Sequence, residues 1–267
     1  MTFQPILPTS GYNGWIFLDR TFEKQQDIFS SQPEIVRDTE YFRENIATIQ
    51  TAEDLVSDRR LLSVALGAFG LDDDINSQFF IKKILEEGTV SDEALANRLS
   101  DSRYADFSAA FGFGDQAIPA TQGAGFASEI IGRYEVRQFE QAVGEQDNDL
   151  RLAMSVKEGI SDILDGNTTS AGQWYSILGN PPMRSVFQTA LGLPDSSSAI
   201  DLDRQLEIFQ TRAQSVFGSD DLADFSTPEQ QEKLIRIFLI RSEAAKFSLS
   251  SGSSTALTLL QSTPSFY

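Results

Sequence analysis

A run of acidic residues in the first half of the chain is the strongest candidate for chemistry. It reads D-D-D-I-N, and Asp72, Asp74 and Asn76 fall on the first, third and fifth positions of an EF-hand-like calcium loop. The match then ends, because Ser77 stands where the sharp turn needs glycine and Lys83 stands where a bidentate glutamate is needed. The run is therefore not predicted to bind calcium.

The same run has a structural interpretation. It follows Gly70 and precedes apolar residues at helical spacing. Carboxylates at that place would meet free N–H groups and the positive end of the helix dipole. We therefore expect a polar cap on a helix that buries Phe79 and Phe80.

Paired carboxylates are the other candidates for chemistry. Asp201 with Asp203, and Asp220 with Asp221, have the residue types for glycoside hydrolysis or magnesium binding. Such pairs are expected on the surface of a chain with 39 acidic residues, and no second motif supports either of them. The two arginines at 59–60 are expected to form structural ion pairs with Asp54, Asp58 or the acidic turn.

Composition excludes several kinds of site. The chain has no His and no Cys, so it cannot supply Ser-His-Asp or Cys-His catalysis, and it lacks the usual ligands of zinc, haem and iron–sulfur clusters. No catalytic residue, metal ligand or cofactor is predicted. The formal net charge of −18 repels phosphate backbones and anionic membranes, so neither nucleic acid binding nor membrane insertion is expected.

Targeting signals are also not found. No stretch has the roughly 20 apolar residues of a spanning helix. No basic residue precedes Arg20, so the N-terminus lacks the charged start of a secretory signal peptide.

The elements that position these residues are predicted to be helices, because apolar residues recur at spacings of three and four. Residues 129–164 could form one broken helix or two consecutive ones. The remaining helices are predicted at residues 37–49, 54–69, 75–87, 91–99, 102–111, 174–178, 183–191, 200–216 and 228–247.

An internal repeat is visible at an offset of 122 residues. It places S-V-A-L-G-A-F-G-L at 63–71 on S-V-F-Q-T-A-L-G-L at 185–193, so Gly70 aligns with Gly192. A-D-F-S occurs at 105–108 and again at 223–226. Each copy would be a helix ending in glycine, a polar turn and a second helix.

The predicted fold is therefore an all-α multi-helix bundle built from two diverged repeats, with irregular uncharged ends. Whether the repeats make one domain or two is open. The predicted ranges are an N-terminal segment and lead-in at 1–30, a first repeat at 31–114, a linker at 115–128, a second repeat at 129–249 and a tail at 250–267.

Both ends of this acidic chain lack side chains that are charged at pH 7. Residues 2–18 and 250–267 carry none, although both contain apolar and aromatic groups. The ends could fold back over the protein's own core, or they could form a docking surface that becomes ordered on binding a partner. The candidate interaction residues are Phe3, Trp15, Phe17, Leu257, Leu260, Phe266 and Tyr267.

Several long strings carry a family resemblance. They are V-R-D-T-E-Y-F-R-E-N-I at 36–46, the block D-L-V-S-D-R-R through D-D-D-I-N at 54–76, F-I-K-K-I-L-E-E-G-T at 80–89 and A-L-A-N-R-L at 94–99. The sequence resembles a bacterial domain-of-unknown-function family of helical repeat proteins that are often encoded in flagellar gene clusters. The family implies no catalytic residue.

The resemblance implies a non-enzymatic flagellum-associated protein, with a structural, assembly or regulatory role exerted through protein partners. It would act in the cytoplasm or at the flagellum. The alternative is a carboxylate-dependent module or enzyme that binds a metal or a small ligand.

Overall fold

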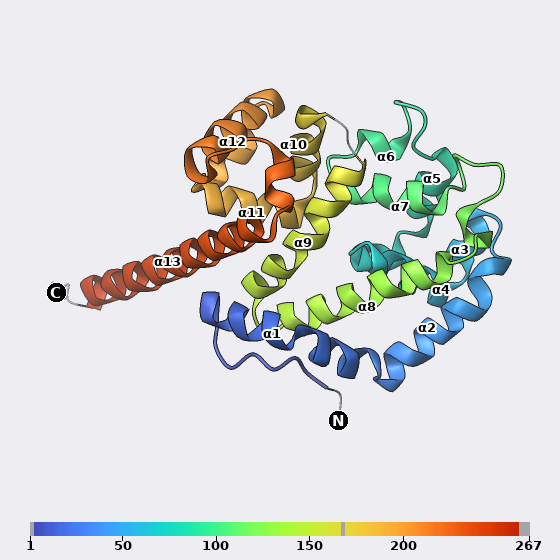
Figure 1. Ribbon diagram of the computed structural model, residues 1–267, viewed down its shortest axis with the longest axis horizontal. Helices are drawn as coiled ribbons and strands as arrows, with labels where there is room; N and C mark the ends of the chain where they lie inside the picture. Colours follow the sequence, from blue (N-terminus) through green and yellow to red (C-terminus); the bar gives the residue numbers. More distant parts are fainter. Residues whose placement is uncertain (1–2, 167–168, 262–267) are drawn as a thin grey trace, which may run out of the picture. The chain divides into compact units, whose positions relative to one another are not determined.

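The computed structural model describes residues 3–166 and 169–261, with side chains described up to Phe247. The described residues form thirteen α-helices and five short 3-10 helices, and none of them lies in a strand (Figure 1). The prediction of an all-α protein is confirmed. None of the described helices combines the length and the apolar character that crossing a bilayer requires.

The chain divides into two compact units. The first unit is residues 1–7, 17–151 and 178–181, and the second is residues 8–16, 152–177 and 182–267. These units differ from the predicted ranges, because the predicted linker and the residues up to 151 lie in the first unit. The physical reason is that the helix after the predicted linker packs on a helix of the first repeat.

The first unit is built around two helices, α4 (Arg59–Ala68) and α8 (Phe126–Gly144), which pack against each other and against α2 (Pro33–Asn45). The other helices with residues in this unit are α1 (Gly11–Ser30), α3 (Ala52–Ser57), α5 (Gln78–Glu87), α6 (Leu95–Arg98) and α7 (Arg103–Phe111), with 3-10 helices η1 (Ile46–Thr48), η2 (Asp72–Asn76) and η3 (Ala120–Gln122).

The contact between α4 and α8 depends on a small residue. A Cβ atom added at Gly67 would lie 2.8 Å from the Tyr134 ring, closer than van der Waals contact allows. Leu61, Leu62 and Leu66 of α4 are fully buried. Close packing of this helix therefore forms the centre of the unit's core.

The second unit has an aromatic core. Phe187 and Phe225 each pack edge to face against Trp174, and Phe217 packs in the same way on Phe225. Trp15 also belongs to this unit, so the unit contains both tryptophans of the chain. The helices that lie wholly or mostly in this unit are α9 (Asn148–Gly166), α10 (Ser170–Gly179), α11 (Pro181–Leu191), α12 (Leu202–Phe217) and α13 (Pro228–Gln261), with η4 (Asp195–Ala199) and η5 (Leu222–Ser226). The first residues of α1 also belong to it.

The repeated turn has the same geometry in both units. Gly70 has a φ of 66° and Gly192 a φ of 67°, the left-handed conformation that ends a helix. The next amide, of Leu71 or Leu193, bonds at 3.0 Å to the carbonyl five residues earlier. This is the Schellman arrangement, and a 3-10 helix and an α-helix follow in both copies. The predicted order of helix, glycine, polar turn and helix therefore occurs twice.

The ends of the chain are more helical than the sequence analysis predicted. Residues 11–30 form α1, and α13 remains helical through Gln261, so the prediction of irregular ends is corrected in both places. The apolar residues Trp15, Leu18, Phe22 and Phe29 are separated by three, four and seven residues, which is typical of one face of a helix. The helix was not predicted because Gly11 and Gly14 stand at its start.

Two further expectations are wrong. Residues 54–69 form two helices and not one, because the backbone of Asp58 is extended and starts α4 anew. Phe79 is 82% exposed rather than buried, and the apolar face of α5 is instead formed by Ile81, Ile84 and Leu85.

Candidate functional site

A polar cluster on α2, α3 and α4 is the best-defined surface site of the first unit. It begins with a capping box at the start of α3, where Thr51 Oγ1 accepts from the Asp54 amide at 3.1 Å. In return, Asp54 Oδ2 accepts from the Thr51 amide at 3.0 Å. Hydrogen bonding to the Thr51 side chain, and then to the Gln50 and Thr51 amides, lowers the pKa of Asp54. The box fixes where α3 begins.

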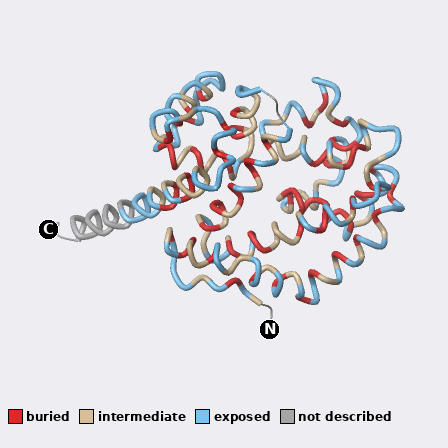
Figure 2. Tube along the Cα trace, viewed as in Figure 1, coloured by how far each residue is buried: buried red, intermediate tan, exposed pale blue. Residues whose placement is uncertain are grey.

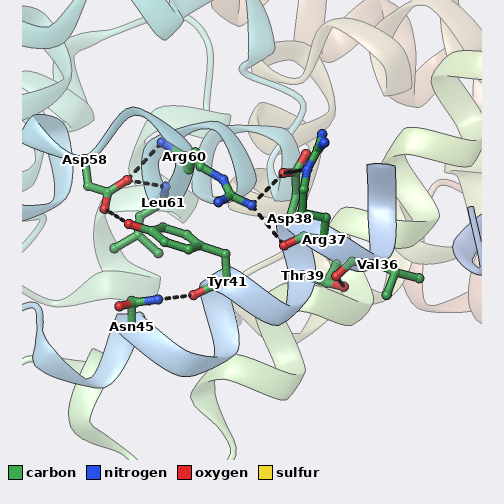
Figure 3. Close-up of polar contacts among 9 residues, drawn as sticks. All are labelled: Val36, Arg37, Asp38, Thr39, Tyr41, Asn45, Asp58, Arg60 and Leu61. Carbon is green, nitrogen blue, oxygen red and sulfur yellow. Dashed lines mark hydrogen bonds and ion pairs between the residues drawn. The ribbon is translucent and has the colours of Figure 1, made fainter. Parts of the chain in front are cut away.

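Asp58 is the centre of this cluster. One carboxylate oxygen accepts from the amides of Arg60 at 3.0 Å and Leu61 at 3.1 Å, which caps α4. The other oxygen accepts from the Tyr41 hydroxyl at 2.7 Å (Figure 3). That hydrogen bond is the main reason why the pKa of Tyr41 is raised. A single carboxylate thus joins α2 to α4.

Arg60 closes the cluster from the side of α4. Its guanidinium carbon lies 4.1 Å from the centre of the Tyr41 ring, a cation–π contact. One of its nitrogens donates to the Arg37 carbonyl at 3.0 Å and to Asp38 at 3.2 Å (Figure 3). Arg60 therefore forms an ion pair, but its partner is Asp38 and not Asp54, Asp58 or the acidic turn.

A pocket of about 610 Å³ lies beside this cluster and is open to solvent. Its lining includes both signs of charge, but all four ionisable side chains are already hydrogen-bonded within the protein. Arg59, for example, donates to Asn76 in the acidic turn at 3.1 Å. The wall of the pocket is thus a polar surface whose charged groups are held in place by hydrogen bonds within the protein. The residues lining the pocket are Thr48, Ile49, Gln50, Asp54, Ser57, Asp58, Arg59 and Arg60.

The structure gives the acidic run a different role from the predicted cap. Asp72 accepts from the Gln138 side chain at 3.0 Å, and Asp74 accepts from the Tyr104 hydroxyl at 2.6 Å. These side chains thus connect η2 to α8 and α7 and leave the helix amides uncapped. Within the described ranges, no three acidic residues lie close enough to hold a metal ion.

The paired carboxylates predicted from the sequence also have structural contacts. Asp201 accepts from the Asp203 amide at 3.0 Å, which caps α12, and Asp203 accepts from the Tyr175 hydroxyl at 2.5 Å. Asp221 caps η5, and the Asp220 carbonyl accepts from the Trp174 indole at 2.8 Å. Both pairs therefore lie at helix starts.

The candidate interaction residues are spread over both units. Phe3 and Phe17 are half-buried in the first unit, and Trp15 is buried in the second. The side chains of Leu257 and Leu260, and all of Phe266 and Tyr267, lie outside the described residues. The structure therefore does not bring this set together in one described surface.

A contact that the sequence did not predict involves Glu232 on α13. One of its oxygens accepts from the Tyr12 hydroxyl at 2.6 Å, and the other from the Trp15 indole at 3.2 Å. The first of these bonds is the main cause of the raised pKa of Tyr12. More than 200 residues separate the partners, so no local pattern could have indicated the pair.

Comparison with solved structures gives one informative match. It is the crystal structure of a protein from Agrobacterium tumefaciens, a structural genomics target, with a TM-score of 0.73 and 29% sequence identity. The match covers 90% of this chain and 98% of the other. None of the curated proteins matches this chain.

A family described as "Protein of unknown function (DUF1217)" matches residues 68–230. The match extends from the end of α4 into the first turn of α13 and includes the glycines of both Schellman turns, Gly70 and Gly192. The pocket and the Asp58 cluster precede the matched residues. The chain belongs to the DUF1217 family.

Proposed function

We propose that this protein is a non-enzymatic flagellum-associated protein that acts through protein–protein contacts. Its role would be structural, assembly-related or regulatory. The flagellar association is supported by the resemblance of residues 36–99 to proteins often encoded in flagellar gene clusters. The proposed non-enzymatic role is supported by the cluster around Asp58, because its charged groups make hydrogen bonds that hold α2, α3 and α4 in place.

The observation that carries the proposal is the exposed face of α13. The helix has 34 residues, but its described buried residues all precede Ile240 (Figure 2). Ile240 is 53% exposed and Phe247 is 77% exposed, and a spacing of seven residues places them on one side of the helix. Large exposed apolar side chains that share a face are typical of interaction surfaces.

Swimming through soft agar tests both parts of the proposal. We expect a strain without the gene to spread less than a complemented strain at equal growth rate. Complementation with the double variant Ile240→Asp and Phe247→Asp should fail, because two carboxylates on this face would oppose an apolar partner. Val90→Asp, at an exposed apolar position in the first unit, is the matched control and should restore spreading.

The outcomes separate the two parts of the proposal. Normal swimming by the deletion strain would refute the flagellar association. Full rescue by the α13 variant, at wild-type protein level, would refute α13 as the contact surface and leave the association standing.

The alternative function is a carboxylate-dependent module that binds a metal or a small ligand. The open pocket with Asp54 and Asp58 on its wall is the feature that favours it. A ligand that binds only the folded state raises the melting temperature as its concentration rises. We expect no shift with magnesium or calcium, and a concentration-dependent rise would favour the alternative.

A further inference from the structure

The first described residues of the chain lie along α1. Residues 3–7, named here the strap, have no helical or strand structure (Figure 1). The Phe3 amide donates to Gln32 Oε1 at 2.9 Å, and the Ile6 amide donates to Gln25 Oε1 at 2.6 Å. Gln25 lies in α1 and Gln32 lies just before α2, seven residues further along the chain. The three-residue step from Ile6 back to Phe3 spans that separation only when the chain is extended. The strap is therefore extended and antiparallel to the stretch from Gln25 to Gln32.

The surface that holds the strap is formed by three glutamines, and we name it the groove. Gln25 also donates its Nε2 to the Ile6 carbonyl at 3.4 Å, so one side-chain amide contacts both backbone groups of one residue. Gln146 donates to the Pro5 carbonyl at 2.8 Å. All these groups lie in the first unit. Side-chain hydrogen bonds of this kind recognise the backbone of an extended segment, as they do in peptide-binding proteins.

The strap covers the glutamines of the groove and supplies hydrogen-bond partners to them. Gln25 is only 5% exposed and Gln32 is also buried, and a buried amide destabilises the fold unless its hydrogen bonds are made. Thr21 supplies one partner for Gln25, at 2.7 Å, and the strap supplies the others. Without the strap, these amides would face solvent, and either water or the backbone of another extended segment could take its place.

The strap itself is weakly anchored. Pro5 is its one buried residue among those described, while Ile6 is exposed. The burial of one proline and a few hydrogen bonds contributes little beyond the entropy of ordering five residues. The strap should therefore leave the groove far more readily than a core helix leaves its neighbours.

We propose that the groove is a docking site for the strap of a second copy of this chain, which exchanges with the chain's own. The second copy is the fitting partner because its strap carries the same proline and the same backbone groups. Charge also favours this segment: two copies of net charge −18 repel each other, but residues 2–18 bring no charge to the contact. The ligand class is an extended, uncharged, proline-containing segment.

A titration with a fluorescent peptide of residues 1–9 tests recognition in the full-length chain. A strap variant, Pro5→Asp with Ile6→Pro, places a carboxylate at the buried position and removes the Ile6 amide, so its own strap should leave the groove open. We expect the peptide to bind the strap variant at least tenfold more tightly than the wild type, in which the groove is occupied.

Groove substitutions in the strap variant supply the controls. Adding Gln25→Ala, or separately Gln146→Ala, should weaken peptide binding at least tenfold, whereas Gln78→Ala on α5 should leave it unchanged. Two different groove positions keep the test informative if one substitution prevents folding. Absence of binding to the strap variant, or equal binding after both groove substitutions, would overturn the proposal.

Exchange between whole chains is measured with a label on the strap variant. The chain has no cysteine, so Glu44→Cys gives a single site for a fluorophore. When the strap of an unlabelled wild-type chain enters the open groove, the labelled strap variant becomes part of a larger complex, so excess wild type should raise its fluorescence anisotropy. The same labelled strap variant with Gln25→Ala added should show no rise. Peptide binding without any such rise would overturn the second copy as the partner.

Discussion

Asp58 shows how one side chain can fix two elements. Its two oxygens bond to the start of α4 and to Tyr41 on α2, so its loss would affect both the cap and the contact between helices. The sequence predicts charge pairing around residues 54–60 because two aspartates are followed there by two arginines. It could not predict Tyr41 as a partner, since the two residues meet only after α2 and α4 have packed.

We expect Asp58→Ala to lower the free energy of unfolding by about 1–2 kcal/mol, because the substitution removes an N-cap. Asp58→Asn should cost less, since an amide oxygen can still accept from the helix amides. Tyr41→Phe removes the hydroxyl alone and should have the smallest effect of the three. Urea unfolding measures these differences. Equal losses for Asp58→Asn and Asp58→Ala would contradict the capping role.

Two tyrosines should titrate unusually late. Burial, and then the hydrogen bond to Asp74, raise the pKa of Tyr104 to about 12. Burial, with the nearby charges of Asp38 and Asp72, raises the pKa of Tyr134 to about 12. Because these values exceed the value of about 10 for an unfolded chain, neutral tyrosine stabilises the fold fully below pH 10. That contribution is lost as the pH rises from about 10 to 12.

Tyrosinate absorbance measures this titration directly. We expect a late phase near pH 12 in the folded protein, smaller in Tyr134→Phe and in Tyr104→Phe. The same phase should disappear in denaturant. A single transition near pH 10 in the native protein would show that neither phenol is shifted.

At the scale of elements, we expect the same substitution to destabilise both Schellman turns. Gly70→Ala and Gly192→Ala should each destabilise the protein by about 1–2 kcal/mol, because alanine is strained at positive φ. Gly132→Ala on α8 is the matched control. A Cβ atom there would meet nothing within 4 Å, and the change should stabilise α8 by up to about 1 kcal/mol.

Thermal unfolding of the three glycine variants compares these effects. The melting temperature should fall for the two turn variants and rise for Gly132→Ala. A fall for Gly70→Ala but not for Gly192→Ala would mean that the second turn tolerates the substitution. The two copies would then share a geometry without sharing its energetic importance.

Helical periodicity predicted most elements in the middle of the chain, because buried apolar residues recur there at three and four. It failed where a short side chain sets the boundary. The break at Asp58 depends on a cap, and the start of α1 lies among glycines. The acidic run 72–76 was located correctly, but its contacts with Gln138 and Tyr104 depend on α7 and α8 and could not be read from local sequence.

At the scale of the whole molecule, the internal repeat predicted two related turns but not the division of the chain. The helix α8 belongs to the first unit, where Gly67 allows it to approach α4 closely. The glutamines of the groove were also missed. Gln25 and Gln32 are seven residues apart, a spacing that matches no known motif, and they contact a segment that lies 19 to 29 residues earlier in the chain. Gln146 is 141 residues from its partner Pro5.

The position of Trp15 and Trp174 in one unit has a spectroscopic consequence. Tryptophan emission should report the unfolding of the second unit alone, whereas far-ultraviolet circular dichroism averages over all helices. If the units unfold separately, the two signals should give different midpoints in urea, and Gly70→Ala should shift the dichroism curve while leaving the emission curve in place. Coincident curves would show that the two units unfold together as one cooperative system.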